Sequence, residues 1–317
     1  VSNKKSDMQE CDLELINEAV YEYISQYVDP QDILKNEPMS RHTTFRVGGP
    51  ADVLVTPEAE KLAAVTGACR EAGEPYYIVG NGSNLLVGDG GIRGVVILTR
   101  DGMDEISADG VRITAGAGAL LSRTASLAAS HALTGMEFAA GIPGTIGGAV
   151  VMNAGAYGGE MRDIIETVTV LDETGAQHVL SVEELELGYR TSCILKKHYI
   201  VTQAVLKLAA GEEQAIRARM KELATQRAEK QPLEYPSAGS TFKRPEGYFA
   251  GKLIMDAGLR GYRVGGAQVS QKHCGFVVNT GNATAQDVRT LIADVSAEVD
   301  RQFQVKLEPE IKMLGEF

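Results

Sequence analysis

The chain contains no tryptophan, and its 4 cysteines lie far apart without a Cys-X-X-Cys motif. Cys11, Cys69, Cys193 and Cys274 therefore predict reduced thiols in a cytoplasmic protein, and their spacing excludes a disulfide framework or a common zinc site. The 5 histidines add no metal-binding motif. We expect no metal ion.

Positive charge is outnumbered: 31 Lys and Arg residues stand against 42 Asp and Glu residues, which gives a net charge of -11. This balance disfavours generic binding to nucleic acid or to an anionic membrane. The first ten residues are polar and do not resemble a signal peptide. Residues 138–159 carry no charge and are long enough to span a bilayer, but their glycines, Pro143 and Asn153 favour a loop system. We expect a cytoplasmic protein without a membrane partner.

The length of 317 residues predicts two or three domains. Hydrophobic periodicity predicts helices over 11–29, 120–133 and 212–230, and a last helix that follows a Thr284 cap. We expect a further helix that is capped by Thr56-Pro57 and ends at Gly73. Strands are predicted at 51–55, 76–79, 94–98, 111–115, 167–171, 178–181, 199–206 and 305–313. The resulting division is a helical extension over 1–35, lobes over 36–98 and 99–210, and a third domain over 211–317.

A glycine loop, Gly80-Asn81-Gly82-Ser83-Asn84-Leu85, directly follows the predicted strand 76–79. Glycines allow successive backbone N–H groups to converge on an anion, and the Ser and Asn side chains add donors. The loop fits neither a Walker A motif nor the GxGxxG fingerprint of a Rossmann fold. A simple Gly-Asn hairpin turn remains the alternative.

A second glycine cluster covers 141–148 and 153–159. Two such loops can hold one large ligand between them. Glycine-rich bends without any ligand are the structural alternative.

Six segments follow one another along the chain: 41–51 with its Thr44-Phe45-Arg46-Val47-Gly48-Gly49-Pro50 core, 79–86, 141–148 with 153–158, Tyr189-Arg190, 238–245 and 307–310. In this order, they resemble the motifs of UDP-N-acetylenolpyruvoylglucosamine reductases. The resemblance covers about residues 36 to 315. Six ordered segments are far more specific than one glycine loop.

The resemblance implies an α+β protein with an FAD-binding domain of the vanillyl-alcohol-oxidase type, in two lobes, and a C-terminal α+β substrate-binding domain. It implies FAD as cofactor and NADPH as co-substrate. No His or Cys occurs in 76–98 or 141–159, which favours non-covalent FAD. The residues it assigns to the cofactor are Arg46, Gly80, Asn81, Gly82, Ser83, Asn84, Leu85, Gly141, Pro143, Gly144, Thr145, Gly147, Gly148, Asn153, Ala154 and Gly155.

The implied reaction reduces UDP-N-acetylglucosamine enolpyruvate to UDP-N-acetylmuramate, with hydride added to C3 and a proton to C2. Arg190 is expected to bind the substrate carboxylate through its guanidinium fork. Ser240 is expected to donate the proton. Glu310, chosen over Glu308 by the family motif alone, is expected to hydrogen-bond toward the same carboxylate or the intermediate.

For the UDP-sugar, we expect contacts from Tyr189, Arg244, Lys252, Tyr262, Gln268 and Lys272. The short connections resemble the family type that lacks an extra substrate-capping loop. The simplest assembly is a monomer, although the sequence leaves an oligomer open. The alternatives are another FAD-dependent oxidase or dehydrogenase of the same fold, and a nucleotide-binding module without catalysis.

Overall fold

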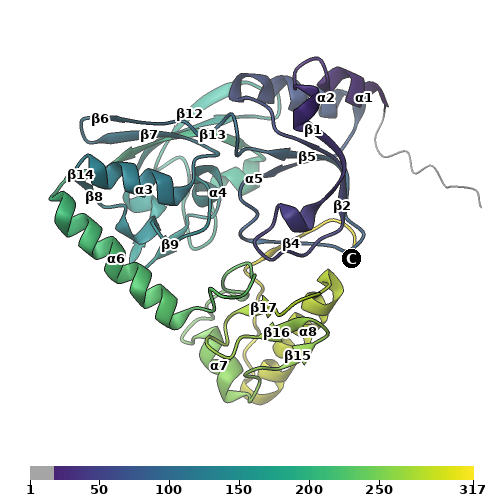
Figure 1. Cartoon of the computed structure of the whole chain (residues 1–317), viewed down its shortest axis with the longest axis vertical. Helices are drawn as coiled ribbons and strands as arrows, with labels where there is room; N and C mark the ends of the chain where they lie inside the picture. Colours follow the sequence, from purple (N-terminus) through teal and green to yellow (C-terminus); the bar gives the residue numbers. More distant parts are fainter. Residues whose placement is uncertain (1–17) are drawn as a thin grey trace, which may run out of the picture.

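The first lobe is a four-stranded sheet in the order β1-β2-β5-β3, as seen in the computed structural model, which describes residues 18–317 (Figure 1). Strands β2 and β3 run parallel to β5, and β1 is antiparallel to β2. Successive residues of β2 enter different cores, Val53 and Val55 on the side of α2 and Leu54 on the other. Both faces are therefore buried, which explains the unbroken apolar run. The bounds are β1 (Ile33–Pro38), β2 (Pro50–Val55), β3 (Tyr76–Val79), β5 (Ile92–Leu98), α1 (Glu18–Ile24) and α2 (Leu62–Ala72).

The expected Thr56-Pro57 cap is wrong, because α2 begins only at Leu62, after a 3-10 turn over Ala59–Lys61. The Thr56 backbone N–H donates to the Asp32 carbonyl, which keeps Thr56 in extended chain. The predicted end is confirmed: Gly73 adopts the left-handed conformation with φ 72°. Of the helix predicted over 11–29, the structure contains α1, and residues 11–17 lie outside the described part.

The second lobe is a five-stranded antiparallel sheet in the order β12-β11-β13-β7-β6. One continuous core joins it to the first lobe, with Val95 and Ile97 on one side and Ile113 and Val170 on the other. The bounds are β6 (Ile106–Asp109), β7 (Arg112–Gly116), β8 (Leu133–Thr134), β9 (Gly155–Ala156), β10 (Gly159–Glu160), β11 (Ile165–Leu171), β12 (Gln177–Ser181), β13 (Ile200–Lys207), β14 (Ala209–Ala210), α3 (Leu121–Ser130), α4 (Ile146–Val151) and α5 (Cys193–Lys197).

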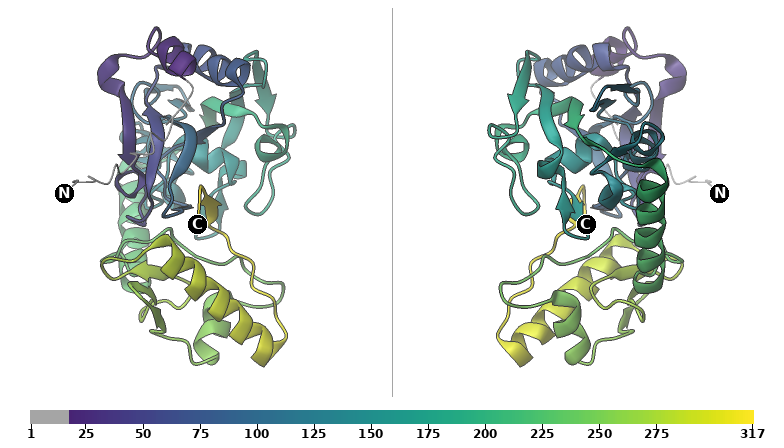
Figure 2. Two further views of the ribbon diagram at one scale, coloured as in Figure 1. Left: turned by 90° about the vertical axis from the view of Figure 1, so that its right-hand side faces the viewer. Right: turned by 90° about the vertical axis from the view of Figure 1, so that its left-hand side faces the viewer.

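The third lobe packs α7 (Ala250–Asp256) and α8 (Ala285–Phe303) on a small sheet, β15 (Arg263–Val264), β16 (Ala267–Val269) and β17 (Val277–Asn279). Figure 2 shows that it stands apart from the two other lobes. The Thr284 cap is confirmed, since its hydroxyl accepts from the Asp287 N–H and the Asp287 carboxylate accepts from the Thr284 N–H. The core of the third lobe is separate from the other cores but includes Phe45, Val47 and Leu86 from the first lobe.

Two elements assigned to the third domain by sequence contact the other lobes. Helix α6 (Glu213–Lys230) packs on the second lobe, against α3, β8 and the turn Glu137–Ala139. The last strand, β18 (Lys312–Leu314), pairs in parallel with β4 (Leu85–Val87) of the first lobe. The strand predicted over 305–313 is therefore wrong in its bounds, because the ladder forms only where β4 supplies a partner edge.

Within residues 18–317, no helix combines the length and the apolar character needed to cross a membrane. The uncharged segment 138–159 contains the end of the 3-10 turn Glu137–Ala139, the short helix α4, the two-residue strand β9 and the first residue of β10. The same part of the chain contains no group of three or more His, Cys, Asp or Glu side chains that could hold a metal ion. Cys69, Cys193 and Cys274 are buried free thiols, and Cys11 lies outside the described residues.

Candidate active site

The two glycine loops lie against each other in the structure. The Asn81 amide donates to the Pro143 carbonyl at 2.7 Å. The first loop is no hairpin turn, because β3 pairs with β5 whereas β4 pairs with β18. The loop instead connects two different sheets, and the hairpin alternative is wrong.

Side chains larger than glycine do not fit where the loops meet. A Cβ atom at Gly80 would lie 2.4 Å from the Thr145 hydroxyl oxygen, and one at Gly82 would lie 2.1 Å from the His42 carbonyl oxygen. Gly82 also has φ +60°, which other residues adopt rarely. The loops thus lie close together, with Ser83 beside Gly144. These residues fit the diphosphate-bearing chain of FAD, which binds to backbone N–H groups.

Asn153 connects two loops through its side chain, a structural role that the sequence did not indicate. It is 1% exposed and has a positive φ of 41°. Its side-chain amide donates to the Gly188 carbonyl at 3.2 Å, and its side-chain oxygen accepts from the Arg162 N–H at 3.0 Å. Asn153 therefore ties the loop before β9 to the turn that carries Tyr189 and Arg190.

Arg190 pairs with Glu310, from which it is separated by 120 positions in the sequence. The Arg190 Nε lies 2.5 Å from the Glu310 Oε1, and the side chains are only 22% and 11% exposed. Arg190 has φ 56°, held by the mutual hydrogen bonds between Gly188 and Thr191. A non-glycine residue in this conformation is strained and is often found at functional sites. Within residues 18–317, the hydrogen bond of this guanidinium runs through Nε, and none is found for its two terminal nitrogens.

The backbone of Glu310 joins three segments at one point. Its N–H donates to the Thr241 carbonyl at 2.8 Å, and its carbonyl accepts from the Asn84 side chain at 3.3 Å. The Asn84 carbonyl in turn accepts from the Lys312 N–H at 2.9 Å. Asn84, predicted as a cofactor residue, therefore also links the first glycine loop to the strand that carries Glu310.

Ser240 is exposed and makes no hydrogen bond within the described residues. Its neighbours are firmly held. Thr241 is fully buried, its hydroxyl accepts from the Val277 N–H at 2.9 Å, and its N–H donates to the Gly275 carbonyl at 2.8 Å. The hydrogen bonds of Thr241 thus fix the turn, while the Ser240 hydroxyl has no hydrogen-bond partner among the described residues.

His273 stabilises the segment to which Thr241 is hydrogen-bonded. The Gly275 N–H donates to the His273 Nδ1 at 3.1 Å, and the imidazole packs edge-on against Phe276. Burial lowers the pKa of His273 below its ordinary value, because desolvation disfavours the charged ring. We therefore expect this histidine to be neutral near pH 7.

Two of the residues predicted for substrate binding lie beside the Arg190–Glu310 pair. The Tyr189 hydroxyl is 3.4 Å from the Glu310 Oε2 and accepts from the Arg244 N–H at 3.2 Å. The Arg244 guanidinium lies 4.0 Å above the centre of the exposed Phe249 ring. This arrangement brings aromatic and cationic groups next to the Arg190–Glu310 pair.

The remaining substrate candidates have partners elsewhere. Lys252 pairs with Asp256, and the Tyr262 hydroxyl donates to Asp294 at 2.7 Å, which raises the tyrosine pKa. The Gln268 amide donates to the Gly261 carbonyl and its oxygen accepts from Arg263. Lys272 donates to the Ala228 carbonyl at the end of α6. The structure therefore does not bring these four residues into contact with the Arg190–Glu310 pair.

Sequence reasoning missed residues that join the lobes. The Asp89 carboxylate accepts from the Ala285 and Gln286 N–H groups at 2.8 and 2.9 Å, at the start of α8. The Asn279 amide donates to the Phe45 carbonyl at 3.2 Å. Each contact spans about 200 positions, so no local pattern could have indicated it.

The fold defines a flavoprotein, because residues 50–181 match the family model described as an FAD binding domain. Residues 231–314 match the model of the UDP-N-acetylenolpyruvoylglucosamine reductase C-terminal domain. The chain belongs to the UDP-N-acetylenolpyruvoylglucosamine reductase family. It is an FAD-dependent oxidoreductase that uses NADPH and acts in the synthesis of peptidoglycan precursors.

Individual relatives support this assignment over nearly the full length. The chain is 52% identical to the UDP-N-acetylenolpyruvoylglucosamine reductase of Agathobacter rectalis over 314 residues, which covers 95% of this chain and 100% of the relative. It is 53% identical to that of Lachnoclostridium phytofermentans, with 95% and 99% covered. The crystal structure of the Thermus caldophilus reductase is similar with a TM-score of 0.75 at 40% identity, covering 89% of this chain and 98% of that one.

Proposed function

We propose that the enzyme reduces the enolpyruvyl ether of UDP-N-acetylglucosamine enolpyruvate to UDP-N-acetylmuramate with Arg190, Ser240 and Glu310 as its catalytic residues. One observation carries this proposal. The Arg190 side chain pairs with the Glu310 side chain, and the Glu310 backbone is hydrogen-bonded to Thr241, next to Ser240. Three segments distant in sequence thus meet with a carboxylate-binding cation and a free hydroxyl.

The overall reaction consumes NADPH, one proton and the substrate double bond, and yields NADP⁺ and the lactyl ether. The chemistry that bound FAD would supply is hydride transfer, through N5, from NADPH to C3 of the substrate. The glycine loops 80–85 and 141–148 would hold the cofactor without a covalent bond, because neither contains His or Cys. Arg46, with φ 54°, and residues 153–155 are the further candidates for cofactor contact.

Arg190 binds the substrate carboxylate. Hydride addition to C3 leaves negative charge on C2 and the adjoining carboxylate, and a guanidinium placed there before the reaction stabilises that charge. The pair with Glu310 uses Nε and fixes the orientation of the plane. The two terminal nitrogens then face the ligand as a fork.

Ser240 donates the proton to C2. A hydroxyl is a weak acid, but a carbanion is a strong base, and the fixed turn supplies proximity. Glu310 holds Arg190, and because an ionised carboxylate only accepts hydrogen bonds, it would reach the intermediate through a bridging water. Tyr189 and Arg244 lie nearest to this group among the residues proposed for the UDP-sugar, whereas Lys252, Tyr262, Gln268 and Lys272 would need to exchange their present partners.

Several finer assignments belong to the same proposal. The short connections support the family type without an extra substrate-capping loop, and the reduced thiols support a cytoplasmic location. A monomer is sufficient, since all proposed catalytic residues come from one chain. The division at 36–98, 99–210 and 211–317 remains our proposal for the domains, with α6 and β18 reaching back to the flavin lobes.

The test is an anaerobic half-reaction. The purified protein is reduced with NADPH, UDP-N-acetylglucosamine enolpyruvate is added, and the flavin absorbance is followed. Return of the absorbance with one equivalent of UDP-N-acetylmuramate supports the proposal. A flavin that stays reduced would favour the alternative, an FAD-dependent oxidase or dehydrogenase with another substrate.

A further inference from the structure

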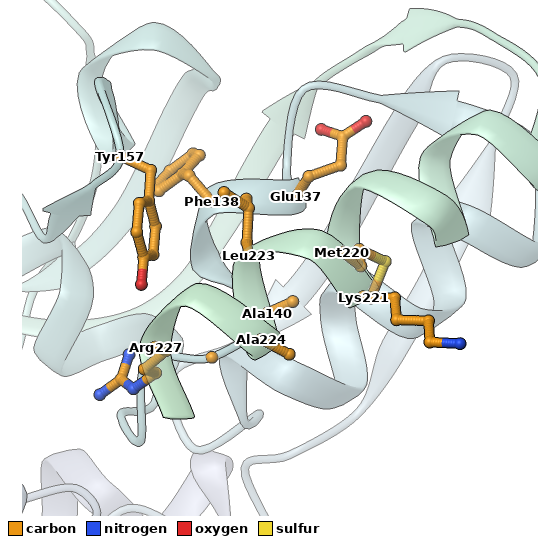
Figure 3. Close-up of a pocket in the computed structure, with 10 residues that line it drawn as sticks. Glu137, Phe138, Ala140, Tyr157, Met220, Lys221, Leu223, Ala224 and Arg227 are labelled. Carbon is orange, nitrogen blue, oxygen red and sulfur yellow. The ribbon is translucent and has the colours of Figure 1, made fainter. Parts of the chain in front are cut away.

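A cavity of about 280 Å³ lies between α6 and the second lobe (Figure 3). Its walls are largely apolar and include Phe138, Ala140, Met220, Leu223 and Ala224. The glycine loop at Gly141 forms part of its lining. The cavity therefore adjoins the proposed cofactor loops but includes a helix from outside the matched FAD binding domain.

Arg227 lies in this cavity without a counter-charge. No hydrogen bond or ion pair of its guanidinium is found within residues 18–317. By contrast, Arg217 and Arg219 of the same helix pair with Glu213 and Glu222. Burial lowers the pKa of Arg227, since desolvation disfavours its charge.

The carboxylate in the cavity lining does not neutralise Arg227. Both oxygens of Glu137 are occupied, one by the Thr134 hydroxyl at 2.6 Å and the other by the Gly135 N–H at 2.8 Å. Lys221, the other charged residue of the lining, is also positive. A partly buried cation without a partner is unfavourable, and an anionic ligand would supply the missing charge.

Tyr157 adds a second donor to the same space. It lies between β9 and β10 with φ 53°. Figure 3 shows its hydroxyl directed toward the Arg227 guanidinium. The Arg227 stem packs on the glycine loop, where a Cβ atom at Gly141 would lie 3.2 Å from its Cδ. A guanidinium, a phenol and glycine backbone thus surround one point of the cavity.

We propose that Arg227 and Tyr157 form a phosphate-binding subsite for one of the enzyme's nucleotide ligands. A guanidinium fork matches phosphate oxygens, and the apolar walls suit the uncharged part of a nucleotide. The inference rests on the proposed function, in which the substrate carboxylate belongs to Arg190. The phosphate can come from FAD, from NADPH or from the UDP-sugar, and the experiment separates these sources.

The test compares holoenzymes of wild type, Arg227→Met, Arg227→Lys and Tyr157→Phe. Lys221→Met is the matched control, because it removes one positive charge from the same helix and the same cavity. UDP and NADP⁺ are titrated by the change in flavin absorbance, and FAD release on dilution is followed by flavin fluorescence. We expect Arg227→Met to weaken the binding of one of the three ligands, UDP, NADP⁺ or FAD, by about tenfold or more. Tyr157→Phe should weaken the binding of the same ligand by a smaller factor.

Thermal unfolding separates a binding role from a structural one. If the ligand is UDP or NADP⁺, the ligand-free Arg227→Met holoenzyme should melt at an equal or higher temperature than wild type, because an unpaired buried charge is gone. If the ligand is FAD, the loss of stability should disappear at saturating FAD. A lower melting temperature that FAD does not restore, with all three affinities equally reduced, would overturn the proposal.

The proposal is also overturned if Arg227→Met and Lys221→Met agree within twofold for all three ligands. Should Arg227→Met give no folded protein, Arg227→Lys decides, with a weakened affinity for one ligand in support and unchanged affinities against. A wild type that binds UDP through Arg227 but does not reduce the enolpyruvate would contradict the proposed function alone.

Discussion

The Arg190–Glu310 pair and the Ser240 turn belong to one proposed site but are built differently. The two charged side chains are largely buried and pair with each other. The Ser240 hydroxyl is exposed and has no partner in the described chain, although Thr241 beside it is fully buried. A charge removed from water is costly unless it is paired, whereas an exposed hydroxyl can exchange water for substrate. Arg190 and Glu310 are therefore positioned by the contact between their side chains, whereas Ser240 is positioned through the backbone of its turn.

Replacing Ser240 by alanine should have the largest effect. We expect NADPH to reduce the flavin at nearly the wild-type rate, and reoxidation by substrate to slow by ~10²-fold or more, the usual effect of losing a general acid. Because the hydroxyl has no partner, stability should change by less than about 0.5 kcal/mol. Stopped-flow absorbance measures the half-reactions, and equal slowing of both would remove Ser240 from the proton step.

Replacing Arg190 by lysine tests the Arg190–Glu310 pair. An ammonium keeps the charge but lacks the fork, so we expect reoxidation to slow by about tenfold or more. Arg112→Lys is the control, since Arg112 pairs with Glu166 through two hydrogen bonds in the same lobe. Wild-type turnover in Arg190→Lys would show that no forked contact is made there.

Replacing Asn84 by alanine tests how the backbone of Glu310, the partner of Arg190, is held in place. The variant loses the hydrogen bond to the Glu310 carbonyl, an effect of about 1 kcal/mol, and we expect kcat to fall up to about tenfold. FAD release is measured on the same sample. Faster FAD release with unchanged kcat would mean that Asn84 serves only the cofactor.

The smallest expected effect concerns pH and the Ser240 turn. The His273 pKa is lowered by burial, so below the unfolded value of about 6.5 the unfolded chain binds a proton that the native ring refuses. Stability is complete above that pH and falls as the pH drops toward the native pKa. Urea unfolding at pH 7.5 and 5.5 should show this slope in wild type.

The matched variants for this prediction are His273→Gln and His131→Gln. The first should reduce the pH slope, while the second, at an exposed position, should leave it unchanged. Equal slopes in all three proteins would assign the acid sensitivity to other groups.

Local features were well predicted from the sequence. The strand at 76–79 has the expected bounds, the helix at 212–230 is α6 to within one residue, and Gly73 and Thr284 end and begin their helices as expected. These features depend on neighbours within about four residues, which the sequence displays directly. The start of α2 was missed because a hydrogen bond from Thr56 to Asp32 competes with the cap.

The candidate site was predicted in its residues but not in its connections. Glycines at 80 and 82 were predicted to form a ligand loop, and their tight contacts with Thr145 and His42 depend on segments 65 and 40 positions away. Asn153 was predicted to contact the cofactor, and the structure adds that its buried amide holds the turn of Arg190. Arg227 was not recognised, because an arginine among many in a charged helix carries no local signal of lacking a partner.

The sequence by itself determined the longer helices α2, α3, α6 and α8, the strands β2, β3, β5, β7, β11, β12 and β13, the glycine loops and the family. It did so because periodicity, capping and backbone permissiveness are properties of short segments. The tertiary structure alone decided that Arg190 meets Glu310, that β18 returns to β4 and that Arg227 remains unpaired beside Gly141. Each of these follows from how the lobes pack their separate cores, which brings together residues that no short-range rule connects.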